Sequence, residues 1–215
     1  MNIVALRERI TLAEQHEMTE STLRSWLEER LPTLHPAIAA AGEHDINKLM
    51  GFVRGYICQV PDVLEAAQAV AIQAQIGPQL LPVLKMAETF FVQPPDLPSD
   101  HCGLLSLLDE AYLAHRLLEE VNDRYLSHGG GQLVPLDTTR ASLIAHHLLE
   151  DSFANKLDAM VQVTVDGLVP DSIFQGPNFS EYKQRMHVEG QRSLWEEWPC
   201  MSQQLGIEIK LRDSF

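Results

Sequence analysis

Cysteine is scarce in this chain, and its few copies form no metal-binding pattern. The 215 residues include three cysteines, Cys58, Cys102 and Cys200, which lie far apart and form no CxxC pair. Zinc sites built from thiolates need closely spaced cysteines, and disulfide frameworks need an even number of them. We therefore expect reduced thiols that serve as small core or boundary residues.

Basic residues and long apolar runs are also in short supply. The chain carries 16 Lys and Arg against 30 Asp and Glu, a formal net charge of −14. Such a field repels nucleic-acid phosphates and anionic membrane surfaces, whereas it suits a basic partner or bound cations. No stretch approaches the roughly 18 apolar residues of a membrane span, and the first residues do not resemble a secretory signal. We expect a cytoplasmic protein that binds neither nucleic acid nor membranes.

The common catalytic fingerprints are missing as well. The sequence contains no GxxxxGK[ST], HExxH or GxSxG motif and no GxGxxG after a strand. The glycine run 129–131 follows a helical pattern instead of a strand, so its expected role is to end that helix and permit a turn. No reaction class can be named from motifs.

Helical periodicity is what the sequence does contain. Hydrophobic residues make up 45% of the chain, which is enough for a sizeable core. We predict a single all-α domain over residues 1–215, a helical bundle or array around a long antiparallel hairpin at about 103–164. The Pro-rich linker 93–100 is a candidate boundary between two layers, and the C-terminal tail is expected to be irregular. The individual helices are predicted at 2–17, 20–31, 45–58, 61–76, 80–91, 103–127, 138–164 and 178–198.

A short repeat inside the hairpin is the main candidate for chemistry. The pattern at 114–120 recurs at 145–151, and each copy places a histidine four residues before a glutamate. Both side chains of a copy therefore leave the same face of their helix. With the turn centred near 132–133, His115 would lie opposite Glu150 and Glu119 opposite His146.

This four-residue square has three interpretations. Imidazole and carboxylate ligands suit a transition-metal ion such as zinc, iron, manganese or nickel, and bundles do build such sites between helices. In a metal-dependent enzyme, Glu119 or Glu150 would be both ligand and proton acceptor. Alternatively, the residues form a partly buried hydrogen-bond network or solvated ion pairs. The His-x-x-x-Glu order differs from the Glu-x-x-His of di-iron bundles.

A second polar row accompanies the square. Its members are His147, Asp151, Asn155 and Asp158 on the second hairpin helix, and Asn122 among the core positions of the first. One interpretation is that all five residues line a polar cleft. The alternative is that the four residues of the second helix form a solvated face. A buried Asn must be hydrogen-bonded to avoid a desolvation cost.

Three functions follow as hypotheses. The first is an acidic protein without defined catalytic activity that acts through protein contacts, either with another protein or as a homodimer. The second is metal binding or metal-dependent catalysis at the square, and the third is binding of a small apolar ligand between helices. The aromatic C-terminal segment would either cap the protein's own core or dock on a partner. Its members are Phe174, Phe179, Tyr182, Trp195 and Trp198.

Overall fold

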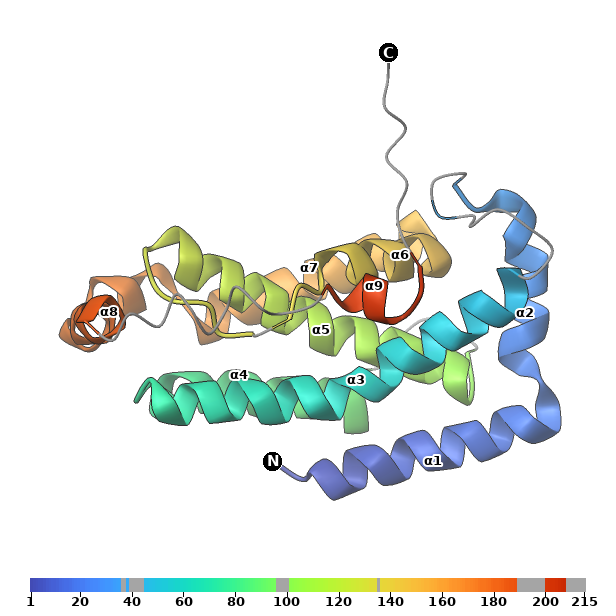
Figure 1. The fold of residues 1–215 in the computed structure, drawn as a ribbon, viewed down its shortest axis with the longest axis horizontal. Helices are drawn as coiled ribbons and strands as arrows, with labels where there is room; N and C mark the ends of the chain where they lie inside the picture. The colour runs from blue at the N-terminus through green and yellow to red at the C-terminus, as the bar shows by residue number, and fades with distance from the viewer. Residues whose placement is uncertain (36–37, 39–44, 96–100, 135, 189–199, 208–215) are drawn as a thin grey trace, which may run out of the picture.

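The prediction of an all-α protein is confirmed by the computed structural model of the chain (Figure 1). The structure describes residues 1–35, 38, 45–95, 101–134, 136–188 and 200–207. Within those residues no strand is present, and no helix is long and apolar enough to cross a membrane. The helices are α1 (Ile3–Glu20), α2 (Thr22–Arg30), α3 (Asp45–Gln73), α4 (Gly77–Val92), α5 (Leu104–Ser127), α6 (Thr139–Leu149), α7 (Asp151–Leu168), α8 (Pro177–Val188) and α9 (Met201–Gln204), with 3₁₀ turns at Leu31–Thr33 and Asp171–Gln175.

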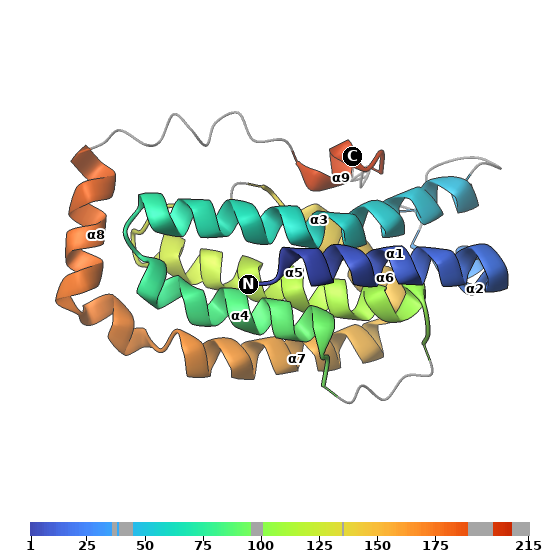
Figure 2. The same ribbon diagram turned by 90° about the horizontal axis from the view of Figure 1, so that it is seen from below.

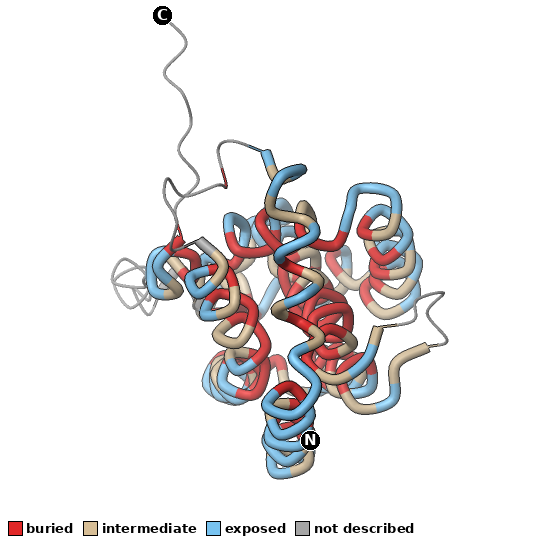
Figure 3. Tube along the Cα trace, turned by 90° about the vertical axis from the view of Figure 1, so that its right-hand side faces the viewer, coloured by how far each residue is buried: buried red, intermediate tan, exposed pale blue. Residues whose placement is uncertain are grey.

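Helix α5 is the central element of the bundle. It packs against α1, α2, α3, α4, α6 and α7, and Figure 2 shows it running between the other long helices. Residues around its whole circumference are buried, which is expected of a helix with neighbours on every side. Figure 3 shows the buried segments gathered where the helices face one another and the exposed segments on the outside. One continuous core extends from Leu6 in α1 to Ile207 after α9.

Helix α3 differs from the prediction because it continues through a proline. We expected separate helices at 45–58 and from 61, whereas α3 is unbroken and contains Pro61 in its interior. An interior proline removes one backbone hydrogen bond and costs about 3 kcal/mol. The buried residues on both sides, Val60, Val63 and Leu64, enter the same core only if the helix continues. Tertiary burial therefore outweighs the local penalty.

The second helix of the hairpin also differs from the prediction, because the structure has two helices in its place. The predicted helix at 138–164 is interrupted at Glu150, which has φ 70° and ψ 135° and separates α6 from α7. The first hairpin helix agrees with the prediction, and the glycine run ends it. Gly129 has φ 75°, and the Gly130 N–H donates to the carbonyl oxygen of Tyr125 at 2.8 Å. This is the bond pattern of a helix that stops at a left-handed residue.

The described part of the C-terminal region packs on the protein's own core. The rings of Phe174, Phe179 and Tyr182 meet the ring of Tyr125 edge-on at centroid distances of 5.4, 5.7 and 6.0 Å. These three residues therefore cap the core, which is the first of the two roles considered for them. The expected end of the last helix, with Trp195 and Trp198, and the tail beyond 207 lie outside the described residues.

Candidate functional site

His115 is a buried residue of the core. It is 1% exposed, and its Nε2 lies 2.9 Å from the carbonyl oxygen of Tyr56. Since a carbonyl oxygen only accepts, Nε2 carries the proton of a neutral imidazole. Burial lowers the pKa of His115 to about 4, and the hydrogen bond to Tyr56 opposes this shift. The ring is therefore neutral at physiological pH and binds the backbone of α3.

Glu119 lies one turn further along α5 and is also buried. Its carboxylate is 3.0 Å from Nη1 of Arg116, and the Thr138 hydroxyl donates to it at 3.4 Å. Burial raises the pKa of Glu119, while Arg116 and Ser142 oppose the rise by favouring the charged form. On α6, the side chain that faces Glu119 is thus Ser142, which precedes the predicted partner His146 by about one helical turn.

His146 and Glu150 make their contacts elsewhere. His146 Nε2 lies 3.3 Å from Asn155 Oδ1 and 3.7 Å from Asp158 Oδ2, both on α7. Glu150 is exposed and forms an ion pair with Arg30 at 2.7 Å. Its unusual backbone conformation directs the chain from α6 into α7 instead of continuing one helix.

The structure does not bring the four-residue square together. No group of three or more His, Cys, Asp or Glu side chains in the described ranges is placed to hold a metal ion. The reason is the register between the hairpin helices and the break at Glu150, neither of which follows from the repeat. Metal binding by His115, Glu119, His146 and Glu150 stays a prediction, which elemental analysis of protein purified without chelator would check.

The second polar row is brought together in part. Asp151 lies 3.5 Å from His146 and 3.7 Å from His147, so this end of the row surrounds the start of α7. Asn122 lies apart from it. Its Oδ1 accepts from the backbone N–H groups of Leu133 and Val134 at 2.8 and 3.3 Å, which holds the loop after α5. The expected hydrogen bonding of Asn122 is thus present, but it is not part of the cleft.

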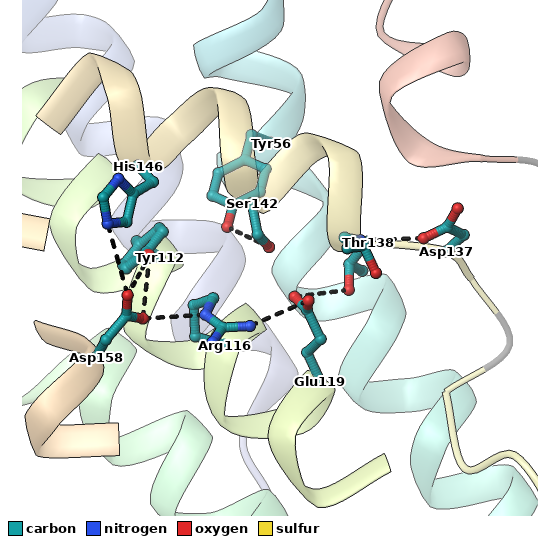
Figure 4. A network of polar contacts seen from close by, with 10 residues as sticks. Tyr56, Tyr112, Arg116, Glu119, Asp137, Thr138, Ser142, His146 and Asp158 are labelled. Carbon is teal, nitrogen blue, oxygen red and sulfur yellow. Dashed lines mark hydrogen bonds and ion pairs between the residues drawn. The ribbon is translucent and has the colours of Figure 1, made fainter. Parts of the chain in front are cut away.

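An arginine that sequence reasoning passed over connects these residues (Figure 4). Arg116 binds Asp158 through Nε at 3.0 Å in addition to Glu119, and so joins α5 to α7. The buried Tyr112 hydroxyl also donates to Asp158, at 3.0 and 3.1 Å from its two oxygens. Burial disfavours the charge on Arg116, but the two carboxylates outweigh it and raise the pKa. Arg116 occurs in only one copy of the repeat. The position of Arg116 along its helix did not indicate that Glu119 and Asp158 would both bind it.

A pocket of about 240 Å³ opens over this Arg116 network. The polar groups of the network that line it already have partners within the chain. A ligand would have to break internal bonds to gain its own, so each new hydrogen bond would be offset by one lost. The network is therefore better suited to holding α5, α6 and α7 together than to binding. The lining residues are Tyr112, Arg116, Glu119, Thr139, Ser142, Leu143, His146 and Asp158.

A second pocket, which we call the end pocket, has a different character. It encloses about 210 Å³ at the end of the bundle where α8 crosses in Figure 2, between the start of α4, the end of α5 and the 3₁₀ turn before α8. No charged side chain lines it. Gln79 Oε1 is buried and has no hydrogen-bond partner in the described structure. The lining residues are Ile76, Gln79, Tyr125, Ser172, Ile173, Gly176, Pro177, Asn178 and Phe179.

Comparisons with known proteins give no relative from which a function could be transferred. No protein-family model matches the sequence, and neither the curated proteins nor the solved structures contain a match. The described fold defines the chain as an all-α helical bundle with an apolar pocket at one end. A fold alone does not define function, whereas the residues of a site can indicate it.

Proposed function

We propose that the protein binds a small, mostly apolar molecule in the end pocket. The observation that carries this proposal is an uncharged pocket of about 210 Å³ with aromatic and aliphatic walls, including the buried rings of Tyr125 and Phe179. An engineered apolar cavity of about 150 Å³ in another protein is large enough for benzene. The end pocket therefore has room for one bicyclic ring system.

The pocket walls come from segments that are far apart in the sequence. Ile76 precedes α4, Tyr125 lies in the last turn of α5, and Ile173 belongs to the 3₁₀ turn that leads into α8. Arg185 of α8 donates to the carbonyl oxygen of Ala74 at 3.3 Å, which helps to hold α8 against the turn between α3 and α4. A ligand that fills the pocket would join the same segments, so binding should stabilise the folded protein.

The test uses benzothiophene as an apolar bicyclic probe and a variant that fills the pocket. Ile173 is half-buried in the lining, so Ile173→Trp should occupy the space without opening the core. At ten times its Kd, the probe should stabilise the wild-type protein by about 1.4 kcal/mol. This stabilisation should be lost in Ile173→Trp and retained in Val163→Trp, a substitution at an exposed position of α7. Thermal unfolding and calorimetric titration would measure it, and no binding by wild-type protein would contradict the proposal.

Protein contacts are a second candidate, for which the outer side of α1 is the supporting observation. Val4, Leu12 and Met18 are 66%, 66% and 83% exposed, and they lie on the side of α1 opposite its buried row. In this alternative the protein is a cytoplasmic homodimer whose two copies associate through α1. It binds no nucleic acid. Sedimentation velocity over a concentration series would test it, and a constant monomer mass would remove this candidate.

A further inference from the structure

We infer that the ligand of the end pocket is a neutral, planar ring system that carries an N–H or O–H donor, which Gln79 receives. This inference rests on the proposed function and names the chemical class of its ligand. Indole and phenol derivatives are members of this class. Three features of the pocket point to this class: the unpaired acceptor of Gln79, the aromatic walls and the lack of charge.

Gln79 supplies the first observation. Its side chain lines the pocket, and Oε1 is shielded from solvent with no donor in the described structure. Buried carbonyl oxygens are nearly always hydrogen-bonded in folded proteins, because an unpaired one loses its water without replacement. A rotation of the Gln79 amide toward the cavity would let a ligand with a donor supply the missing bond, whereas a hydrocarbon would leave the acceptor unpaired. This distinguishes Gln79 from the polar groups around Arg116, which are already paired.

Tyr125 supplies the second observation. The residue as a whole is 2% exposed and its side chain lines the same pocket, where its ring forms part of the wall. Because a hydroxyl both donates and accepts, Tyr125 can bind either a polar edge of the ligand or an ordered water that the ligand retains.

The aromatic walls favour a flat ring. The lining rings of Tyr125 and Phe179 contact each other edge-on at an interplanar angle of 77°, and Phe174, which does not line the pocket, meets each of them edge-on at 83°. Such rings gain from further edge-to-face or offset contacts with another aromatic ring. The lining has no Asp, Glu, Lys or Arg to neutralise a ligand charge, and the net charge of −14 opposes an anion. A neutral aromatic ligand fits both conditions.

The experiment compares indole with benzothiophene, which has nearly the same size and shape but no N–H. Calorimetric titration of the wild-type protein should show indole binding roughly three- to tenfold more tightly, the range expected for one net hydrogen bond. In Gln79→Met, which removes the acceptor but keeps the side-chain length, the two affinities should become equal. Gln73→Met, at an exposed position of α3 outside the pocket, should keep the wild-type ratio.

The outcomes separate this inference from the proposed function. If both probes bind the wild-type protein equally, the donor inference is overturned and ligand binding in the pocket stands. If neither binds, both are overturned. Should Gln79→Met fail to fold, 1-methylindole provides the same comparison in wild-type protein. It lacks the N–H and is expected to bind at least threefold more weakly than indole, and equal affinity would overturn the inference.

Discussion

His115 illustrates how burial decides the chemistry of a residue. As a sequence feature it belonged to a pattern of histidine and glutamate that suggested metal ligation. In the structure its ring is enclosed in the core and donates to the Tyr56 carbonyl oxygen, 2.9 Å away. Its lowered pKa, about 4, is a consequence of this burial and links the protonation of His115 to the stability of the fold.

The pH dependence of unfolding should reveal this linkage. Between pH 6.5 and 4 the unfolded chain protonates His115 while the folded protein does not, so acidification lowers the free energy of unfolding. The loss should approach about 3 kcal/mol, from a shift of about 2.5 units at about 1.4 kcal/mol each. The His115→Gln variant keeps an N–H donor but cannot be protonated. Urea unfolding curves measured between pH 6.5 and 4 should therefore lack this part of the pH-dependent loss of unfolding free energy. His128→Gln, an exposed control, should keep the wild-type slope, and an identical slope in His115→Gln would contradict the assignment.

Helix boundaries were predictable where the signal was local. Gly129 ends α5 because glycine tolerates the left-handed backbone conformation that the stop requires. The continuation of α3 through Pro61 was not predictable, because it depends on side chains buried against distant helices. The break between α6 and α7 was not predictable either, since Glu150 is neither glycine nor proline and no local pattern marks it.

Backbone strain at Glu150 is the element-scale prediction. A non-glycine residue at φ 70° and ψ 135° costs about 1–3 kcal/mol, whereas the exposed ion pair with Arg30 is worth about 0–1 kcal/mol. Glu150→Gly should therefore raise the free energy of unfolding by about 1 kcal/mol, because relief of strain exceeds loss of the pair. Glu150→Ala loses the pair and keeps the strain, so it should lower stability by a few tenths of a kcal/mol. Equal stability of the two variants in chemical denaturation would show that the position is unstrained.

The core of the whole molecule is continuous across the Pro-rich linker. Helix α4 before the linker and helix α5 after it pack along one another, and α1 contacts both. A boundary between independent units would instead separate two cores. The single domain over residues 1–215 stays a prediction, and the linker residues 96–100 lie outside the described residues.

Unfolding should accordingly occur in one cooperative step. Far-ultraviolet circular dichroism reports the helices, and near-ultraviolet circular dichroism reports the packing of the buried tyrosines in the core. Their transitions in guanidinium chloride should coincide, because no large part of the core can be exposed while the remainder stays intact. Two separated transitions would show that the segments before and after the linker unfold independently.

The sequence by itself determined the helical class, most helix positions and the turn after α5, because periodicity and glycine act over a few neighbouring residues. Only the tertiary structure decided which faces meet. Glu119 faces Ser142, Arg116 joins two acidic partners, and the four-residue square does not assemble. The end pocket combines segments from residue 76 to residue 179, and its unpaired acceptor depends on what distant side chains leave unfilled. Register, burial and cavities result from long-range packing, and no local pattern specifies them.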